Sequence, residues 1–215
     1  MHKAPLGVLC AWSVVMLGAR MWYSGRGTFS FLAWNLLLAA VPVVMAVVLQ
    51  ALALRRAPAA LQFLVFGAWL AFLPNAPYLI TDFVHLAARP PVPLWYDIAM
   101  LGSFAATGAL LGYGSVADVE AVIADRFGTV AGALVAFGSL GLCGFGIYLG
   151  RFGRWNSWDL LTAPSALARE AMAVFADPFA QPRALVVSTI YGLVLMLGYA
   201  ALHGFARSLS RNRPG

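Results

Sequence analysis

The residues with the clearest potential for chemistry fall in three short segments of the chain. The first is FLPNAPYLITDFVHL, residues 72–86, where Tyr78, Asp82 and His85 recur at a spacing that places them on one face of a helix. A carboxylate beside an imidazole fixes the tautomer of the ring, so Asp82 could orient His85 as a general base. The same pair could supply two metal ligands. The alternative interpretation is a polar turn without chemistry.

The other two segments add one acid at the start of an apolar run and a group of arginines. Trp95-Tyr96-Asp97 places an ionisable side chain where it is costly, which favours a functional site. In the segment YLGRFGRWNSWD, Arg151 and Arg154 could bind phosphate or carboxylate, because guanidinium matches these groups with paired hydrogen bonds. The alternatives are anchoring of the arginines at the membrane surface and an ion pair of Asp97 with Arg151 or Arg154.

These segments give a predicted site for an anionic substrate. The candidate catalytic residues are Asp82, His85, Asp97 and Asp159. The candidate substrate-binding residues are Asn75, Tyr78, Tyr96, Tyr148, Arg151, Arg154, Asn156 and Trp158. No metal site is predicted, because a first-row metal needs three or four ligands and the other histidines, His2 and His203, fall on the opposite side of the membrane in the predicted topology. Cys10 and Cys143 lack zinc-binding spacing, and the sequence leaves the cofactor open.

Composition sets the class of protein in which these residues must work. Of the 215 residues, 62% are hydrophobic and 10% are charged, and the mean hydropathy is +0.82. No water-soluble surface can be built from so few charges. The net charge of +6 comes from arginines scattered between apolar runs, which favours contact with the lipid bilayer and excludes a basic face for nucleic acid. We therefore predict an all-α, polytopic transmembrane helical bundle.

Apolar runs long enough to cross the bilayer divide the chain into about six spans within a single transmembrane domain. The predicted spans are residues 6–21, 29–54, 59–77, 94–116, 129–150 and 184–206. The first is expected to be a retained span and not a cleaved signal peptide. Pro74 and Pro77 should break the third helix. Residues 117–128 should form a short polar helix or loop. Residues 165–176, which follow Pro164, should form an interfacial helix that ends near Asp177, before the last span.

The loops after the first, third and fifth spans lie on one side of the membrane, so the polar segments should converge on one face. Gly108-x-x-x-Gly112 and Gly146-x-x-x-Gly150 predict close packing between helices of one chain. Counted over the termini and loops, with Arg20 in the first loop and Arg213 in the tail, lysines and arginines number seven on each side of the membrane. If Arg151 and Arg154 belong to a site, the remaining charges place both termini in the cytoplasm.

The three motifs, in this order, resemble the bacterial membrane-protein family catalogued as domain of unknown function 1361. The resemblance extends from the second span to the sixth. It implies a multi-span protein of the bacterial cytoplasmic (inner) membrane with no established activity, substrate or cofactor.

Three classes of function fit these observations. The leading hypothesis is a membrane-embedded enzyme that acts on a lipid or lipid-linked anionic substrate, because acid, imidazole and guanidinium groups gather at headgroup level. The second is a small transporter or channel that uses the broken helix and Asp97 to pass an ion or solute. The third is a non-catalytic accessory or assembly protein whose polar face binds a protein partner that the sequence does not identify.

Overall fold

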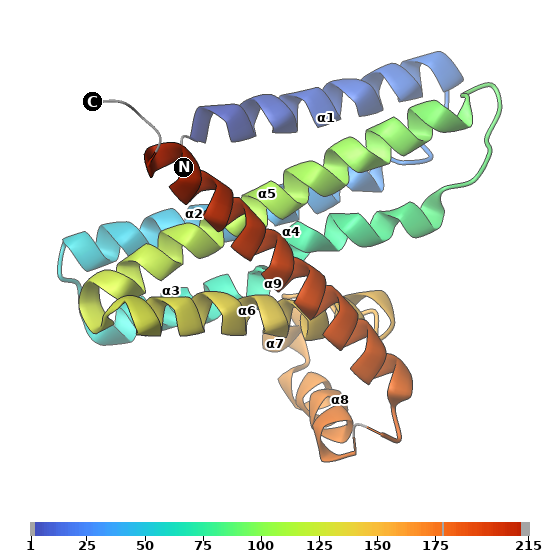
Figure 1. Cartoon of the computed structure of the whole chain (residues 1–215). Helices are drawn as coiled ribbons and strands as arrows, with labels where there is room; N and C mark the ends of the chain where they lie inside the picture. The colour runs from blue at the N-terminus through green and yellow to red at the C-terminus, as the bar shows by residue number, and fades with distance from the viewer. Residues whose placement is uncertain (1–2, 178, 212–215) are drawn as a thin grey trace. The chain divides into compact units, whose positions relative to one another are not determined.

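A computed structural model describes residues 3–177 and 179–211, and the regular elements in these residues are helices (Figure 1). His2 and Arg213, which entered the sequence argument, lie outside the described residues. In chain order the elements are α1 (Lys3–Ser24), α2 (Phe31–Leu54), α3 (Ala59–Phe72), α4 (Asn75–Tyr78), the 3-10 helix η1 (Leu79–His85), α5 (Leu94–Phe127), α6 (Thr129–Arg151), α7 (Asp159–Thr162), α8 (Pro164–Ala176) and α9 (Pro182–Arg211).

The helical segments confirm the predicted polytopic bundle. Within the described residues, six segments are long and apolar enough to cross a membrane. They are Pro5–Ser24, Phe31–Leu54, Ala59–His85, Leu94–Phe127, Thr129–Arg151 and Pro182–Phe205. Large apolar side chains such as Val44, Phe63 and Leu64 point outward, as expected where lipid is the solvent.

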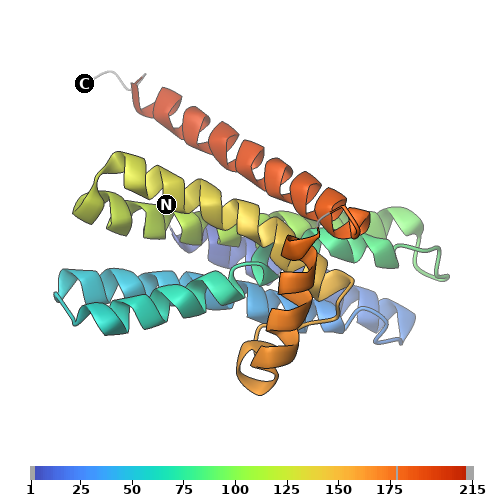
Figure 2. The ribbon, with the colours of Figure 1, turned by 90° about the horizontal axis from the view of Figure 1, so that it is seen from below.

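The chain divides into two compact units, Met1–Ala133 and Leu134–Gly215. In the first unit, α5 packs against α1, α2, α4 and η1, and α2 also packs against α3. Figure 2 shows α2 and α3 side by side, joined by the short turn at residues 55–58. Phe29, Leu32, Leu79 and Phe104 are completely buried in the core of this unit. That the two units form one domain stays a prediction.

The third span is broken, as predicted, but its first helix ends at Phe72 and not near Pro77. Pro74 has no backbone N–H to continue the helix, and the Asn75 side chain donates to the Phe72 carbonyl at 2.9 Å. The single turn α4 then packs on the glycine face of α5. A Cβ at Gly108 would clash with the Ala76 carbonyl oxygen, so the predicted Gly108-x-x-x-Gly112 packing is confirmed.

Helix α5 differs from the prediction, because residues 117–128 do not form a separate helix or loop. They continue α5 to Phe127, and the helix ends at Gly128, whose φ is 94°. No proline or glycine interrupts residues 116–127, and alanine and glutamate favour helix there. The 34 residues of α5 span about 51 Å at a rise of about 1.5 Å per residue, more than the roughly 30 Å of hydrocarbon. Helix α5 is therefore longer than the apolar layer.

In the second unit, α6 and α9 meet through glycines. A Cβ at Gly144 would overlap the Ser188 carbonyl oxygen, and Gly192 lies against Gly141. The close approach of α6 thus includes Gly144, two residues before the predicted Gly146. Helix α8, expected as an interfacial helix, is present; its position at the membrane surface stays a prediction.

Candidate functional site

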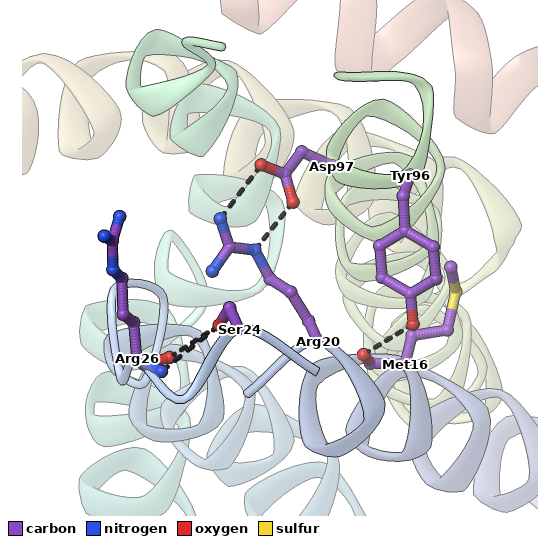
Figure 3. A network of polar contacts seen from close by, with 6 residues as sticks. All are labelled: Met16, Arg20, Ser24, Arg26, Tyr96 and Asp97. Atoms are coloured by element: carbon purple, nitrogen blue, oxygen red, sulfur yellow. Dashed lines mark hydrogen bonds and ion pairs between the residues drawn. The ribbon is translucent and has the colours of Figure 1, made fainter. Parts of the chain in front are cut away.

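A buried ion pair lies where the end of α1 meets the start of α5. Arg20 Nε donates to Asp97 Oδ1 at 2.6 Å, and Arg20 Nη2 donates to Asp97 Oδ2 at 3.0 Å (Figure 3). Both side chains are 1% exposed. Beside the pair, the Tyr96 hydroxyl donates to the Met16 carbonyl at 2.8 Å. A charge in this apolar interior needs a paired partner, and the two-bond fork between Arg20 and Asp97 satisfies that need.

Sequence analysis had treated Arg20 as a loop charge and had offered Arg151 or Arg154 as the ion partner of Asp97. The structure corrects both points, because Arg20 is buried and takes both carboxylate oxygens of Asp97. The signal was present in the sequence, since Arg20 falls inside the predicted first span. An arginine and an aspartate inside spans, at ends that share one membrane face, are expected to pair.

Two aromatic side chains that the sequence analysis did not select connect this pair to His85. Phe29 is completely buried, and the guanidinium carbon of Arg20 lies 4.4 Å from its ring centroid. The guanidinium carbon of Arg89 lies 4.9 Å from the same ring. The centroids of Phe29 and Phe31 are 6.0 Å apart, and the Phe31 and His85 rings meet edge to face at 5.0 Å. Asp97 and His85 are thus linked through one arginine and two rings.

The surroundings of Phe29 carry more positive charge than the Arg20–Asp97 ion pair neutralises. Arg20 Nη1 is buried and has no hydrogen-bond partner within the described residues. Arg89 is half-buried, and no ion pair to a carboxylate is present for it in this part of the chain. Arg26 Nη1 donates to the Pro90 carbonyl at 3.5 Å, so the loop after α1 and the loop before α5 are held together beside these groups.

Asp82 is the second buried acid of this end of the unit. It is 1% exposed, and its Oδ2 accepts a hydrogen bond from Asn35 Nδ2 at 3.0 Å. It lies in η1, not in the α-helix that the predicted spacing assumed. In a 3-10 helix, side chains three residues apart lie one above the other, which places Asp82 and His85 on one side of η1. The Asp82 carboxylate is buried, whereas the His85 imidazole is exposed.

The remaining candidates of the first unit make local hydrogen bonds. Asn75 binds the Phe72 carbonyl, as described above, and the Tyr78 carbonyl accepts a hydrogen bond from the Thr81 hydroxyl at 2.7 Å. Asn75 and Tyr78 are both half-buried. The first unit therefore brings together Asp82, His85, Asp97 and Tyr96 at one end, and Asn75 and Tyr78 lie at the helix break that leads to η1.

The candidates of the third segment lie in the second unit. Arg151 is the last residue of α6, and Arg154 is exposed, with a φ of 59°. The Tyr148 ring stacks with the Phe145 and Phe152 rings, at centroid distances of 6.3 and 5.8 Å.

Asp159 and its neighbours form the turn that starts α7. Asp159 Oδ2 accepts the backbone N–H of Asn156 at 2.7 Å, and Oδ1 accepts the Thr162 hydroxyl at 3.0 Å. Trp158 is 37% exposed. The neighbouring Trp155 donates from Nε1 to Glu170 Oε2 at 2.6 Å, which ties this turn to α8. These bonds give Asp159 a structural role in the turn, and a catalytic role for it stays a prediction.

Comparison with known protein families now identifies the chain. Residues 34–197 match the family described as "Protein of unknown function (DUF1361)". The chain belongs to this family. Searches of curated proteins and of solved structures found no match.

The DUF1361 match covers all three sequence motifs but begins at Trp34, after Arg20, Phe29 and Phe31. Part of the candidate site of this DUF1361 chain therefore comes from residues before the matched region. Within the described residues, no group of three or more histidine, cysteine, aspartate or glutamate side chains is placed to hold a metal ion.

Proposed function

We propose that this chain is a membrane-embedded enzyme that acts on a lipid or lipid-linked anionic substrate at one membrane face. The observation that carries the proposal is the arrangement around Phe29. Two guanidinium groups lie on this buried ring, and the exposed imidazole of His85 lies one aromatic ring further on. Arginines at the ends of spans lie at the depth of lipid phosphates, to which guanidinium binds with paired hydrogen bonds.

Each residue of this site takes a role that follows from its surroundings. Arg89 binds the anionic group of the substrate. Arg20 adds its Nη1, and Asp97 holds the guanidinium of Arg20 in place, so Asp97 acts as a positioning residue. His85 is the general acid or base, because its imidazole is exposed and can both accept and donate a proton. Asp82, held by Asn35, is the second carboxylate.

The second unit carries further residues that the sequence analysis selected, and their roles are proposed within that unit alone. We assign Arg151 and Arg154 to an anionic group and Tyr148 and Trp158 to an apolar part of a substrate. Asn156 and Asp159 form the turn before α7.

The packing of the broken helix favours an enzyme over a transporter. Transporters expose the backbone of a broken helix to the ion or solute that they carry. Here α4 is packed against the glycine face of α5, and the Phe72 carbonyl at the break accepts a hydrogen bond from Asn75.

We place the protein in the bacterial cytoplasmic membrane with both termini in the cytoplasm. Arg20 is buried and neutralised by Asp97, so it does not act as a loop charge. Without Arg20, the balance of lysine and arginine shifts toward the side of the termini, which is the cytoplasmic side by the positive-inside rule. The candidate site then faces outward.

The experiment that tests the enzyme proposal follows lipid composition over time. The purified chain is reconstituted into vesicles made from a total bacterial lipid extract, and all lipid species are quantified by mass spectrometry. We expect at least one phosphate-bearing lipid to decrease while a product accumulates. His85→Gln should slow this change at least about a hundredfold, the usual contribution of a general acid or base.

Leu64→Ala is the control, because Leu64 is an exposed, outward-facing residue of α3 and is not a candidate site residue. Its lipid profile should change at the wild-type rate. Identical profiles for wild type, His85→Gln and protein-free vesicles would rule out the proposed enzyme.

A further inference from the structure

A polar pocket lies at the opposite end of the first unit from Asp82 and Asp97. Helices α2 and α5 both begin near the candidate site and both end at this pocket, which also includes the turn before α3 and the first turn of α3. Its volume is about 710 Å³, and its polar lining consists of Gln50, Arg56, Gln62, Asp125 and Arg126. The pocket therefore belongs to the other membrane face and is separate from the proposed enzyme site.

Arg56 occupies a backbone position at which glycine is the favoured residue. The Ala57 N–H donates to the Leu52 carbonyl and the Arg56 N–H donates to the Ala53 carbonyl, each at 3.0 Å. This pair of bonds is the Schellman motif that closes a helix, and it places its penultimate residue in the left-handed conformation. Arg56 has a φ of 52°. The backbone disfavours a side chain at this position, so the backbone does not explain the arginine.

The second arginine of the pocket is held in place by neighbouring groups. Arg126 Nη1 donates to Gln62 Oε1 at 3.3 Å, and Gln62 Nε2 donates to the Ala57 carbonyl at 2.7 Å. The guanidinium carbon of Arg126 also lies 5.3 Å from the Phe127 ring centroid. These contacts fix Arg126 at the pocket wall before any ligand arrives, which lowers the entropy lost on binding.

The charges and the exposed apolar surface together define the ligand class. Two guanidinium groups suit a phosphate, while Asp125 provides an acceptor for a donor attached to that phosphate. Leu54, in the same lining, is 81% exposed and offers an apolar contact beside the polar groups. A soluble phosphate would use only the arginines, whereas a phospholipid uses all of these features.

We propose that this pocket binds a phospholipid headgroup whose phosphate carries a hydrogen-bond donor, namely an ethanolamine ammonium or a glycerol hydroxyl. Arg56 and Arg126 hold the phosphate, Asp125 accepts from the ammonium or hydroxyl, and Leu54 contacts the glycerol and acyl region. The site is independent of the enzyme proposal, because none of these residues belongs to the candidate site.

The test measures lipid binding to the purified full chain in detergent by native mass spectrometry. Phosphatidylethanolamine, phosphatidylglycerol and phosphatidylcholine with the same acyl chains are titrated separately. We expect the first two to bind about tenfold more tightly than phosphatidylcholine, since one charge-assisted hydrogen bond corresponds to a factor of that order. Asp125→Leu removes the acceptor and should abolish the preference for phosphatidylethanolamine over phosphatidylcholine, two lipids of equal net charge, while leaving phosphatidylcholine binding unchanged.

Arg56→Gly provides the sharpest variant, because it removes the arginine side chain with its guanidinium at a backbone position that glycine favours. It should weaken phosphatidylglycerol binding about tenfold while the melting temperature stays equal or rises. Arg55→Ala removes the same charge from a neighbouring, exposed residue that does not line the pocket, and should retain wild-type binding. If Arg56→Gly fails to fold, Arg126→Gln tests the second guanidinium through the same measurement of phosphatidylglycerol binding.

Three results would overturn the proposal. Equal losses for Arg56→Gly and Arg55→Ala would mean that only the overall charge attracts lipid. Equal binding of all three lipids would show that Asp125 accepts no hydrogen bond from the headgroup. Displacement of phosphatidylglycerol by millimolar inorganic phosphate would identify a soluble anion as the ligand.

Discussion

Arg20 of α1 and Asp97 of α5 form a two-bond ion pair at 2.6 and 3.0 Å inside an apolar bundle. The two residues come from spans that are separated by α2 and the broken third span. Neither charge is stable there alone, because transfer of an isolated ion into a low-dielectric interior costs several kcal/mol. The pair therefore fixes how α1 lies along α5, and through Phe29 it also fixes the position of the arginine-rich end of the unit.

Removal of one charge of this pair should destabilise the fold strongly. Asp97→Asn leaves the Arg20 guanidinium buried without a counter-ion, at a cost of about 3–5 kcal/mol. We expect a large drop in the melting temperature of the purified protein in detergent, measured by intrinsic tryptophan fluorescence.

The double variant Arg20→Met with Asp97→Leu separates loss of packing from loss of charge. Because apolar side chains of similar volume replace both ions, its stability should return to the wild-type value or exceed it. A double variant as unstable as Asp97→Asn would show that the register of α1 and α5 depends on the ions themselves.

The sequence predicted the helical spans because their signal is local. The length of an apolar run can be read directly from the sequence, and Pro74 interrupts the helix of the third span whatever packs around it. The pairing of Arg20 with Asp97 is tertiary: the sequence places both charges inside predicted spans, and the fold determines which charges meet.

The same distinction explains the other differences. The 3-10 geometry around Asp82 arises from the packing of η1 on α2 and α5, which spacing alone does not encode. Phe29 and Phe31 look like ordinary core residues in the sequence, and only the fold places them between Arg20 and His85.

The packing of α4 on α5 predicts a strong effect of a small substitution. A Cβ at Gly108 would clash with the Ala76 carbonyl oxygen and lie 2.7 Å from Leu79 Cδ1, so Gly108→Ala must push α4 and η1 away from α5. Overpacking of this kind costs about 1–3 kcal/mol. The melting temperature in detergent should fall accordingly.

Gly138→Ala is the control for this prediction, because nothing lies within 4 Å of a Cβ at Gly138. It should melt at the wild-type temperature or slightly above, since alanine favours helix over glycine by about 1 kcal/mol. Equal stability of Gly108→Ala and Gly138→Ala would contradict the close approach of α4 to α5.

The contact between Trp155 and Glu170 predicts how firmly α8 is held. Trp155 Nε1 donates to Glu170 Oε2 at 2.6 Å, and a hydrogen bond to a charged acceptor contributes about 1.5–3 kcal/mol. Trp155→Phe removes the donor and retains an aromatic ring. Amide hydrogen exchange of residues 164–176 should then accelerate, while exchange in α6 stays unchanged.

Trp158→Phe, at the exposed neighbouring tryptophan, is the control and should leave the exchange of α8 as in the wild type. Equal acceleration in both variants would assign the effect to lost aromatic packing and not to the lost hydrogen bond.

The hydrogen bond from Asn35 to Asp82 predicts a separation between folding and activity. Asn35→Leu retains side-chain volume but removes the amide that donates to Asp82 Oδ2 at 3.0 Å. If Asp82 serves as the second carboxylate of the proposed enzyme, its misplacement should slow the lipid conversion in reconstituted vesicles about a hundredfold. Asn35→Asp should slow it as well at neutral pH, because two adjacent carboxylates favour a shared proton and leave a smaller fraction of Asp82 deprotonated. The discriminating measurement is the pH dependence of the rate: Asn35→Asp should shift the profile toward higher pH, whereas Asn35→Leu should lower the rate at every pH.

Equal rates for the wild type and both variants, in protein that remains folded, would contradict this prediction. They would show that Asp82 takes no part in the reaction and serves only the structure of η1.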